Sequence, residues 1–281
     1  MLDESIAYCV PPELVDPLVE VMATYGKRAP QVVAGADHAI VTTRLPNTRA
    51  GSEQRGRIEA AARLLGRIAP IEAKTLTLPS PADGRGEEGT AWALRVGRFV
   101  VNPGRGYELA TTDLRIDLEA SKAFGTGWHP STQLCLEAVE RQVGEGSRVL
   151  DVGAGSGILS IAAARLGARE VVSLDTSLDA VRATRRNARV NGVSRRIRPV
   201  HGTMPQPGLG TFDVVVINIS ARVACALAAP AREAMTPTGV LLVAGVLETQ
   251  RAEVAAALRS AGLRAIEETG NGEWLCLTAH Y

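Results

Sequence analysis

The stretch that decides the fold is VLDVGAGSGILSIAAARLGA, residues 149–168. A short hydrophobic run ends at Asp151, three closely spaced glycines follow, and an alanine-rich helical pattern comes next. This order predicts a buried strand, a tight turn and a helix, the first half of a nucleotide-binding βαβ unit. The next hydrophobic run, VVSLD, ends at Asp175. A carboxylate at the end of that second strand can accept hydrogen bonds from both hydroxyls of a ribose.

Two kinds of ligand suit such a unit. A dinucleotide fold has the spacing G-x-G-x-x-G, but Ile158 occupies the position of its third glycine, and the glycines are Gly153, Gly155 and Gly157. With Asp151 two positions ahead of them, the pattern D-x-G-x-G-x-G resembles the first motif of the S-adenosylmethionine-dependent methyltransferases. A carboxylate attracts a sulfonium and an ammonium and repels a pyrophosphate. We therefore favour a methyltransferase over a dehydrogenase, and over glycines that only let helix and strand pack closely.

The rest of the chain predicts two domains. From residue 92 onward, hydrophobic runs alternate with helical patterns, which is typical of a mostly parallel sheet covered on both faces. The last residues, LRAIEETGNGEWLCLTAHY (263–281), predict a hairpin with an Asn-Gly turn that closes this sheet with an antiparallel strand. The first eighty residues follow the order β-α-β-β-α-β. We expect a ferredoxin-like α+β domain over 1–80, a Pro- and Gly-rich linker over 81–91, and a Rossmann-like α/β class I methyltransferase domain over 92–281.

Further motifs make the resemblance more specific. They are AFGTGWHPSTQLCLEAV (123–139), NARVNGV (187–193), VVVINIS (214–220) and NGEWLCL (271–277). Together with the glycine stretch they resemble the PrmA family over roughly residues 118–281. The resemblance implies an enzyme that uses S-adenosylmethionine to methylate lysine and N-terminal amines of the large-subunit ribosomal protein eleven, at the base of the stalk. It also implies an N-terminal ferredoxin-like domain that recognises this protein substrate.

The resemblance also assigns residues to the cofactor site. By matched position it implies cofactor contacts from Thr132, Gly153, Asp175 and Asn218. Thr132 lies where a helix begins, so that its hydroxyl and the free amides suit a carboxylate. Asn218 ends a strand at the carboxyl edge of the sheet, where ligands bind in open α/β folds. Asn218 is therefore also the candidate catalytic residue.

Three further residues complete the expected cofactor site: Asp151, Gly155 and Gly157. The glycines of KAFGTGWHPSTQLCLEAV (122–139) are expected to shape a flap over the cofactor rather than a phosphate cradle. His129 in this stretch is a candidate general base, but a histidine in such a loop more often braces it through hydrogen bonds, and we favour that structural role.

The residues after Asn218 indicate the acceptor. Enzymes that methylate planar nitrogens of bases or of glutamine typically carry Asn/Asp-Pro-Pro-aromatic there, whereas this chain has Asn-Ile-Ser. This disfavours a base and favours an sp³ amine such as that of lysine. The pKa of lysine, about 10.4, must fall before its lone pair can attack, and a dry site beside a sulfonium lowers it. Positioning and desolvation then supply most of the catalysis.

The amino-acid composition argues against several other functional classes of protein. Among 281 residues, 31 are Lys or Arg and 30 are Asp or Glu, and this balance does not favour nucleic-acid binding. The four cysteines lack C-x-x-C spacing, which argues against a zinc site or a disulfide scaffold and for a reducing compartment. The acidic N-terminus and the lack of a long apolar run argue against a signal peptide or membrane span.

We therefore expect a cytoplasmic enzyme with S-adenosylmethionine as cofactor, no metal, and no DNA or membrane partner. Two alternatives remain open at this point. One is a PrmA-like methyltransferase whose acceptor is another protein or a small amine. The other is a cofactor-binding interaction factor without turnover.

Overall fold

A computed structural model of the chain describes residues 4–26, 30–34, 39–46, 48–68, 71–74, 94–103, 108–119, 127–271 and 273–281. The linker expected over 81–91 and the flap residues 124–126 lie outside these ranges. The chain divides into two compact units. The first comprises Met1–Leu94, Asn102–Glu108 and Ala120–His129, and the second comprises Arg95–Val101, Leu109–Glu119 and Pro130–Tyr281.

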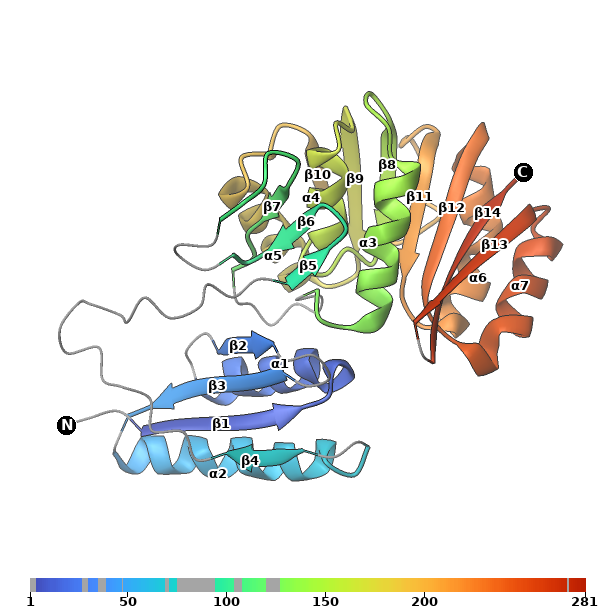
Figure 1. The fold of residues 1–281 in the computed structure, drawn as a ribbon. Helices are drawn as coiled ribbons and strands as arrows, with labels where there is room; N and C mark the ends of the chain where they lie inside the picture. The colour runs from blue at the N-terminus through green and yellow to red at the C-terminus, as the bar shows by residue number, and fades with distance from the viewer. Residues whose placement is uncertain are drawn as a thin grey trace. The chain divides into compact units, whose positions relative to one another are not determined.

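The first unit is a four-stranded antiparallel sheet with two helices (Figure 1). Its elements are β1 (Glu4–Val10), η1 (Pro12–Leu14), α1 (Val15–Gly26), β2 (Gln31–Ala34), β3 (Ala39–Leu45), α2 (Arg49–Leu65) and β4 (Glu72–Lys74). The strand order is β2-β3-β1-β4. Helix α2 begins after Thr48, whose side chain accepts a hydrogen bond from the amide of Gly51. Leu18, Met22 and Ile58 of the two helices are fully buried in the core of this unit.

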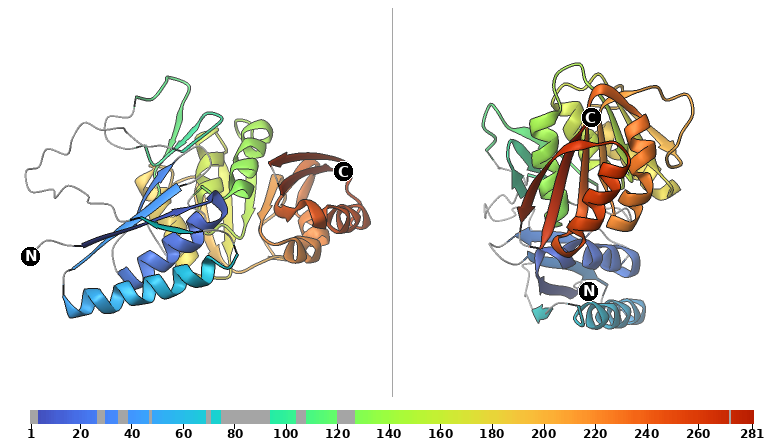
Figure 2. Two further views of the ribbon diagram at one scale, coloured as in Figure 1. Left: turned by 60° about the horizontal axis from the view of Figure 1, so that its bottom comes forward. Right: turned by 90° about the vertical axis from the view of Figure 1, so that its right-hand side faces the viewer.

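The second unit contains a seven-stranded sheet in the order β10-β9-β8-β11-β12-β14-β13. The strands are β8 (Arg148–Val152), β9 (Glu170–Asp175), β10 (Ile197–His201), β11 (Phe212–Asn218), β12 (Met235–Leu247), β13 (Arg264–Asn271) and β14 (Trp274–His280). The first five are parallel, and β14 pairs antiparallel with both β12 and β13. The predicted mostly parallel sheet with an antiparallel hairpin at its end is therefore confirmed (Figures 1 and 2).

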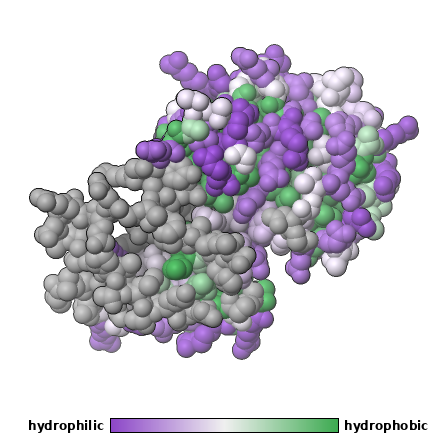
Figure 3. Space-filling model, in the orientation of Figure 1, coloured by the Kyte–Doolittle hydropathy of each residue, from purple (hydrophilic) through white to green (hydrophobic). Residues whose placement is uncertain are grey.

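Five helices cover this sheet. They are α3 (Pro130–Gln142), α4 (Ile158–Arg165), α5 (Leu178–Val190), α6 (Ala221–Glu233) and α7 (Arg251–Ser260), with the short η2 (Glu248–Gln250) before α7. Helices α3, α4 and α5 lie on one face, and α6 and α7 pack together on the other (Figure 1). Strand residues such as Leu150 and Ile217 are consequently buried, and the face of this unit visible in Figure 3 is mostly hydrophilic.

A small sheet in the order β5-β6-β7 was not predicted from the sequence. Its strands, β5 (Leu94–Val96), β6 (Phe99–Val101) and β7 (Leu114–Ile116), have three residues each, too few for a clear alternation of polar and apolar positions. Phe99 is fully buried. The Arg98 side chain donates to Glu140 of α3 at 2.7 Å, which ties the turn between β5 and β6 to that helix.

The order of the strands determines where a ligand can bind. From β8 the chain builds outward through β9 and β10 on one side, and then through β11 and β12 on the other. The connections leaving β8 and β11 therefore diverge at the carboxyl edge of the sheet. Open α/β sheets bind their ligands in the crevice at such a switch point.

Candidate cofactor site

The loop between β8 and α4 lies at this switch point. Gly153, Gly155 and Gly157 have φ angles of 76°, 56° and 83°, in the left-handed region that favours glycine. The amide of Gly153 donates to the carbonyl of Leu174 at 2.8 Å, so the loop is tied to β9. A Cβ on Gly157 would lie 2.8 Å from Cγ2 of Thr184. Backbone conformation therefore favours glycine at all three positions, and the close approach of Thr184 adds a second reason at Gly157.

Asp175 ends β9 beside this loop. Its Oδ2 accepts from the amide of Gly155 at 2.9 Å, and its Oδ1 accepts from the amide of Ser177 at 2.8 Å. An ionised carboxylate has about four acceptor positions, so the two amides orient the group and leave acceptor positions for a ligand. This geometry suits a pair of neighbouring hydroxyl groups.

Thr132 and Asn218 meet at the end of β11. The side-chain amide of Asn218 donates to Oγ1 of Thr132 at 3.3 Å. Thr132 lies in the first turn of α3 and is only 1% exposed, whereas Asn218 is half-buried. The following residue, Ile219, reaches Gly153, since a Cβ on that glycine would lie 2.9 Å from Cδ1 of Ile219. These contacts connect Thr132 and Asn218 to the glycine loop.

Asp151 lies beneath the loop near the end of β8 and is 1% exposed. Its Oδ2 accepts from the hydroxyl of Ser160 at 2.6 Å, and Ser160 also pairs with Ser173 at 2.7 Å. Its Oδ1 has no hydrogen-bond partner among the described residues. Burial raises the pKa of Asp151 to about 6, the bond from Ser160 opposes this, and the charge of Asp175 adds to it. A buried carboxylate with an unpartnered oxygen would be stabilised by a nearby cation.

His129 is a different case, because it belongs to the first unit. It is 8% exposed, and burial lowers its pKa, with an opposing contribution from Glu13. Trp128, next to it, packs against the core of the first unit. The other predicted residues, from Thr132 to Asn218, all belong to the second unit.

Two residues of α5 were missed by sequence reasoning. Thr184 donates its hydroxyl to the carbonyl of Gly155 at 3.0 Å, and Asn187 donates its side-chain amide to the carbonyl of Ser156 at 2.8 Å. Gly245 was also missed: its φ is 77°, and a Cβ there would collide with the carbonyl of Ile219. A glycine inside a strand pattern is a signal for such close approach, and it could have identified Gly245.

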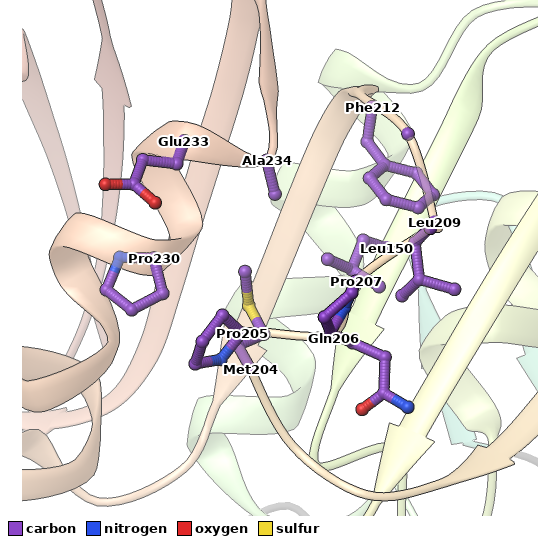
Figure 4. Close-up of a pocket in the computed structure, with 12 residues that line it drawn as sticks. Leu150, Met204, Pro205, Gln206, Pro207, Leu209, Phe212, Pro230, Glu233 and Ala234 are labelled. Carbon is purple, nitrogen blue, oxygen red and sulfur yellow. The ribbon is translucent and has the colours of Figure 1, made fainter.

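A separate cavity of about 230 Å³ lies on the side of the sheet covered by α6 (Figure 4). Its walls come from the loop after β10, the start of β11 and the end of α6. They include Met204, Pro205, Phe212, Pro230 and Glu233. Because none of the predicted site residues lines this cavity, it is distinct from the site around the glycine loop.

Other kinds of site find no support in the described part of the chain. It contains no cluster of three or more His, Cys, Asp or Glu side chains that could hold a metal ion. No described helix has the length and apolar character needed to cross a membrane. The cysteines Cys9, Cys135, Cys225 and Cys276 are free thiols.

The strand order, the glycine loop after β8 and the acid at the end of β9 define a class I S-adenosylmethionine-dependent methyltransferase fold. The dinucleotide alternative is not supported. The sequence profile of the family described as ribosomal protein L11 methyltransferase (PrmA) matches residues 93–281. This chain belongs to that family.

Individual relatives agree with the profile. A ribosomal protein L11 methyltransferase of Pelotomaculum thermopropionicum is 38% identical over 237 residues, which cover 82% of this chain and 76% of the relative. A ribosomal protein L11 methyltransferase of Chloroflexus aurantiacus is 34% identical, and the match covers 97% of this chain and 96% of the relative. The crystal structure of a ribosomal protein L11 methylase from Lactobacillus delbrueckii subsp. bulgaricus superposes with a TM-score of 0.61 at 28% identity, covering 66% of this chain and 97% of that one.

Proposed function

We propose that this protein transfers methyl groups from S-adenosylmethionine to amines of ribosomal protein L11, namely lysine side chains and the N-terminal amine. The observation that carries the proposal is the arrangement of Asp175. Its carboxylate is held by the amides of Gly155 and Ser177 at the switch point of a methyltransferase fold, directly beside the glycine loop. Membership of the L11 methyltransferase family supplies the substrate.

The residues present suit S-adenosylmethionine. Asp175 would accept hydrogen bonds from the ribose hydroxyls through its remaining lone pairs. Gly153, which is exposed and carries no side chain, would let the cofactor approach the backbone of the loop. Thr132 would offer its hydroxyl to the carboxylate of the methionyl group, at the start of α3, where helix amides also favour an anion.

The charge of the cofactor gives Asp151 a role. When bound, S-adenosylmethionine supplies an activated methyl group on a sulfonium cation. The buried carboxylate of Asp151 has an unpartnered oxygen and a raised pKa. One oxygen of Asp151 is already held by the hydroxyl of Ser160. We assign Asp151 an electrostatic role toward the ammonium and sulfonium, and we assign direct contact to Thr132, Gly153 and Asp175.

Asn218 is the residue that we propose to act at the acceptor. It ends β11 at the same edge as the glycine loop, and its side-chain amide is already oriented by Thr132. Its carbonyl oxygen can accept a hydrogen bond from an attacking amine and direct the nitrogen lone pair toward the methyl group. An sp³ amine needs no stacking ring, which agrees with Ile219 and Ser220 following this residue.

The first eighty residues, in this proposal, select the protein substrate and do not bind the cofactor. Every proposed cofactor residue belongs to the second unit. A truncated chain that begins at Thr90 should therefore still bind S-adenosylhomocysteine but fail to methylate L11. Methylation of L11 by the truncated chain at the full-length rate would contradict this division of roles.

Transfer of labelled methyl groups to purified L11 tests the proposed function. The wild-type protein should label L11 on amines, as peptide mass spectrometry would show. Asp175→Ala should lower this activity through a raised KM for the cofactor, and Asp179→Asn, which removes a surface carboxylate from the start of α5, is the matched control. Labelling of another ribosomal protein instead of L11 would reassign the substrate. Cofactor binding without any labelling would refute the proposed enzyme activity.

A further inference from the structure

A row of buried polar residues follows one side of α5 and ends at Asn191, the C-cap residue of this helix. Thr184, Asn187 and Asn191 follow one another at spacings of three and four, so they share one side of the helix. Their exposed fractions are 1%, 1% and 4%. Buried polar side chains are retained when they satisfy hydrogen bonds, and each of these three makes bonds to backbone outside its own helix.

Asn187 joins two segments that are distant in sequence. Its Nδ2 donates to the carbonyl of Ser156 in the glycine loop at 2.8 Å. Its Oδ1 accepts from the amide of Glu119 at 2.9 Å. Because one side-chain atom must donate and the other must accept, these partners fix the orientation of the amide. A single side chain therefore connects the glycine loop with the segment 117–119.

Asn191 holds the same segment but does not reach the loop. Its Oδ1 accepts from the amide of Asp117 at 2.9 Å, and its Nδ2 donates to the carbonyl of that residue. Its remaining bond goes to the carbonyl of Asn187 within α5. The chain thus contains a matched pair of buried asparagines, of which one bonds to both the segment and the loop and the other bonds only to the segment.

Two hydrogen bonds from α5 determine the direction of two backbone carbonyls in the glycine loop. Thr184 binds the carbonyl of Gly155, and Asn187 binds that of Ser156. Both carbonyls are thereby directed toward α5, and the amide of Gly155 points to Asp175 at 2.9 Å. Glycine-rich backbone has many accessible conformations, so without these bonds the loop would spend less time in the arrangement that orients Asp175.

We infer that Asn187 is a positioning residue for cofactor binding, which holds the glycine loop in its binding conformation and couples it to the segment 117–119. The identity of the ligand rests on the proposed function. Loss of Asn187 would lower the fraction of molecules with a competent loop, and the apparent Kd rises as that fraction falls. The effect acts through the loop, since Asn187 itself is buried.

Asn187→Ala and Asn191→Ala form the test, with S-adenosylhomocysteine as the probe in isothermal titration calorimetry. Asn187→Ala should raise the Kd roughly fivefold or more, because a lost bond of about 1 kcal/mol corresponds to that factor. Asn191→Ala should lower the thermal stability about as much as Asn187→Ala does. It should change the Kd by less than twofold, which corresponds to less than about half of that bond energy. Hydrogen exchange should increase in 153–158 and 117–119 for the first variant, and only in 117–119 for the second.

Asn187→Asp provides a second variant in case the alanine variant does not fold. Its carboxylate can still accept from the amide of Glu119 but cannot donate to the carbonyl of Ser156. It should keep the protection of 117–119 and lose affinity for the probe. Equal Kd changes in Asn187→Ala and Asn191→Ala, or wild-type affinity in Asn187→Asp, would overturn the inference. Failure of the wild-type protein to bind the probe would instead overturn the proposed function.

Discussion

Replacing Asp151 with asparagine should change how stability depends on pH. In the folded protein burial raises the pKa of Asp151 from 3.8 to about 6. The folded state thus holds the proton more tightly than the unfolded chain, and stability falls as the pH rises between these values. The penalty is absent below 3.8 and complete above about 6. One pKa unit corresponds to about 1.36 kcal/mol, so ionisation of Asp151 costs roughly 3 kcal/mol at neutral pH.

Asp151→Asn removes this ionisation while keeping the shape of the side chain. Its carbonyl can still accept from Ser160, but its amide replaces the unpartnered Oδ1 and adds a pH-independent cost of about 1–3 kcal/mol. The trend with pH is therefore the measurement. Urea unfolding between pH 4 and pH 7 should show the variant gaining roughly 2 kcal/mol relative to wild type, because part of the full penalty is already present at pH 4. Asp179→Asn controls for the loss of a carboxylate. If the difference in unfolding free energy between Asp151→Asn and wild type did not change with pH, the reasoning would be refuted.

Cofactor binding provides a second readout for Asp151. A cation placed near the carboxylate favours its ionised form, so binding should release a proton around pH 5 to 6, the upper part of the window in which this group titrates. Calorimetry in two buffers with different ionisation enthalpies measures that release. It should be present in wild type and absent in Asp151→Asn. No release in wild type would remove Asp151 from the cofactor site and leave the stability argument intact.

Substitutions at three other site positions give further tests. Asp175→Ala should raise the Kd for S-adenosylhomocysteine by roughly tenfold to a hundredfold, since hydrogen bonds to charged groups are worth about 1.5–3 kcal/mol; calorimetry showing wild-type affinity would contradict the ribose assignment. Thr132→Val should weaken binding severalfold while Thr132→Ser does not, and equal affinities would show that the hydroxyl is not used. Gly157→Ala should destabilise the fold by about 1–3 kcal/mol in urea unfolding, because an alanine there adopts a positive φ and contacts Thr184; unchanged stability would contradict the steric argument.

The main sheet could be predicted because local signals agree with one another there. The runs before Asp151 and Asp175 are hydrophobic throughout, as strands covered on both faces must be. The glycines between Asp151 and Ile158 predict a tight turn before a helix. The Asn-Gly pair at 271–272 predicts a hairpin turn, and β13 ends at Asn271. The same consistency placed Asn218 at the carboxyl edge of the sheet.

The supporting contacts could not be predicted, since they depend on tertiary packing. Thr184 and Asn187 are polar residues in a helix and Asn191 caps its end, and the usual expectation is that such residues face solvent. Only the positions of the loop carbonyls and of the segment 117–119 show why they are buried. Strand β12 begins at Met235, so it includes the polar residues before its apolar part, and its register with β14 shifts between Val243 and Val246, around Gly245. Backbone hydrogen bonds between β12 and its neighbouring strands, and not hydrophobicity, determine where this strand begins and ends.

The charges at the carboxyl edge of the sheet favour a cationic cofactor without reference to any relative. Asp151 and Asp175 lie on the adjacent strands β8 and β9. The negative charge of Asp175 contributes to the raised pKa of the buried Asp151 carboxyl. Among the described residues, no Lys or Arg forms an ion pair with either carboxylate. A pyrophosphate would add negative charge to this edge, whereas a ligand with a sulfonium and an ammonium would relieve the repulsion. The substitution that removes the repulsion, Asp151→Asn, should therefore weaken binding of S-adenosylmethionine and leave the binding of uncharged adenosine unchanged, and equal losses for both ligands would refute the electrostatic role.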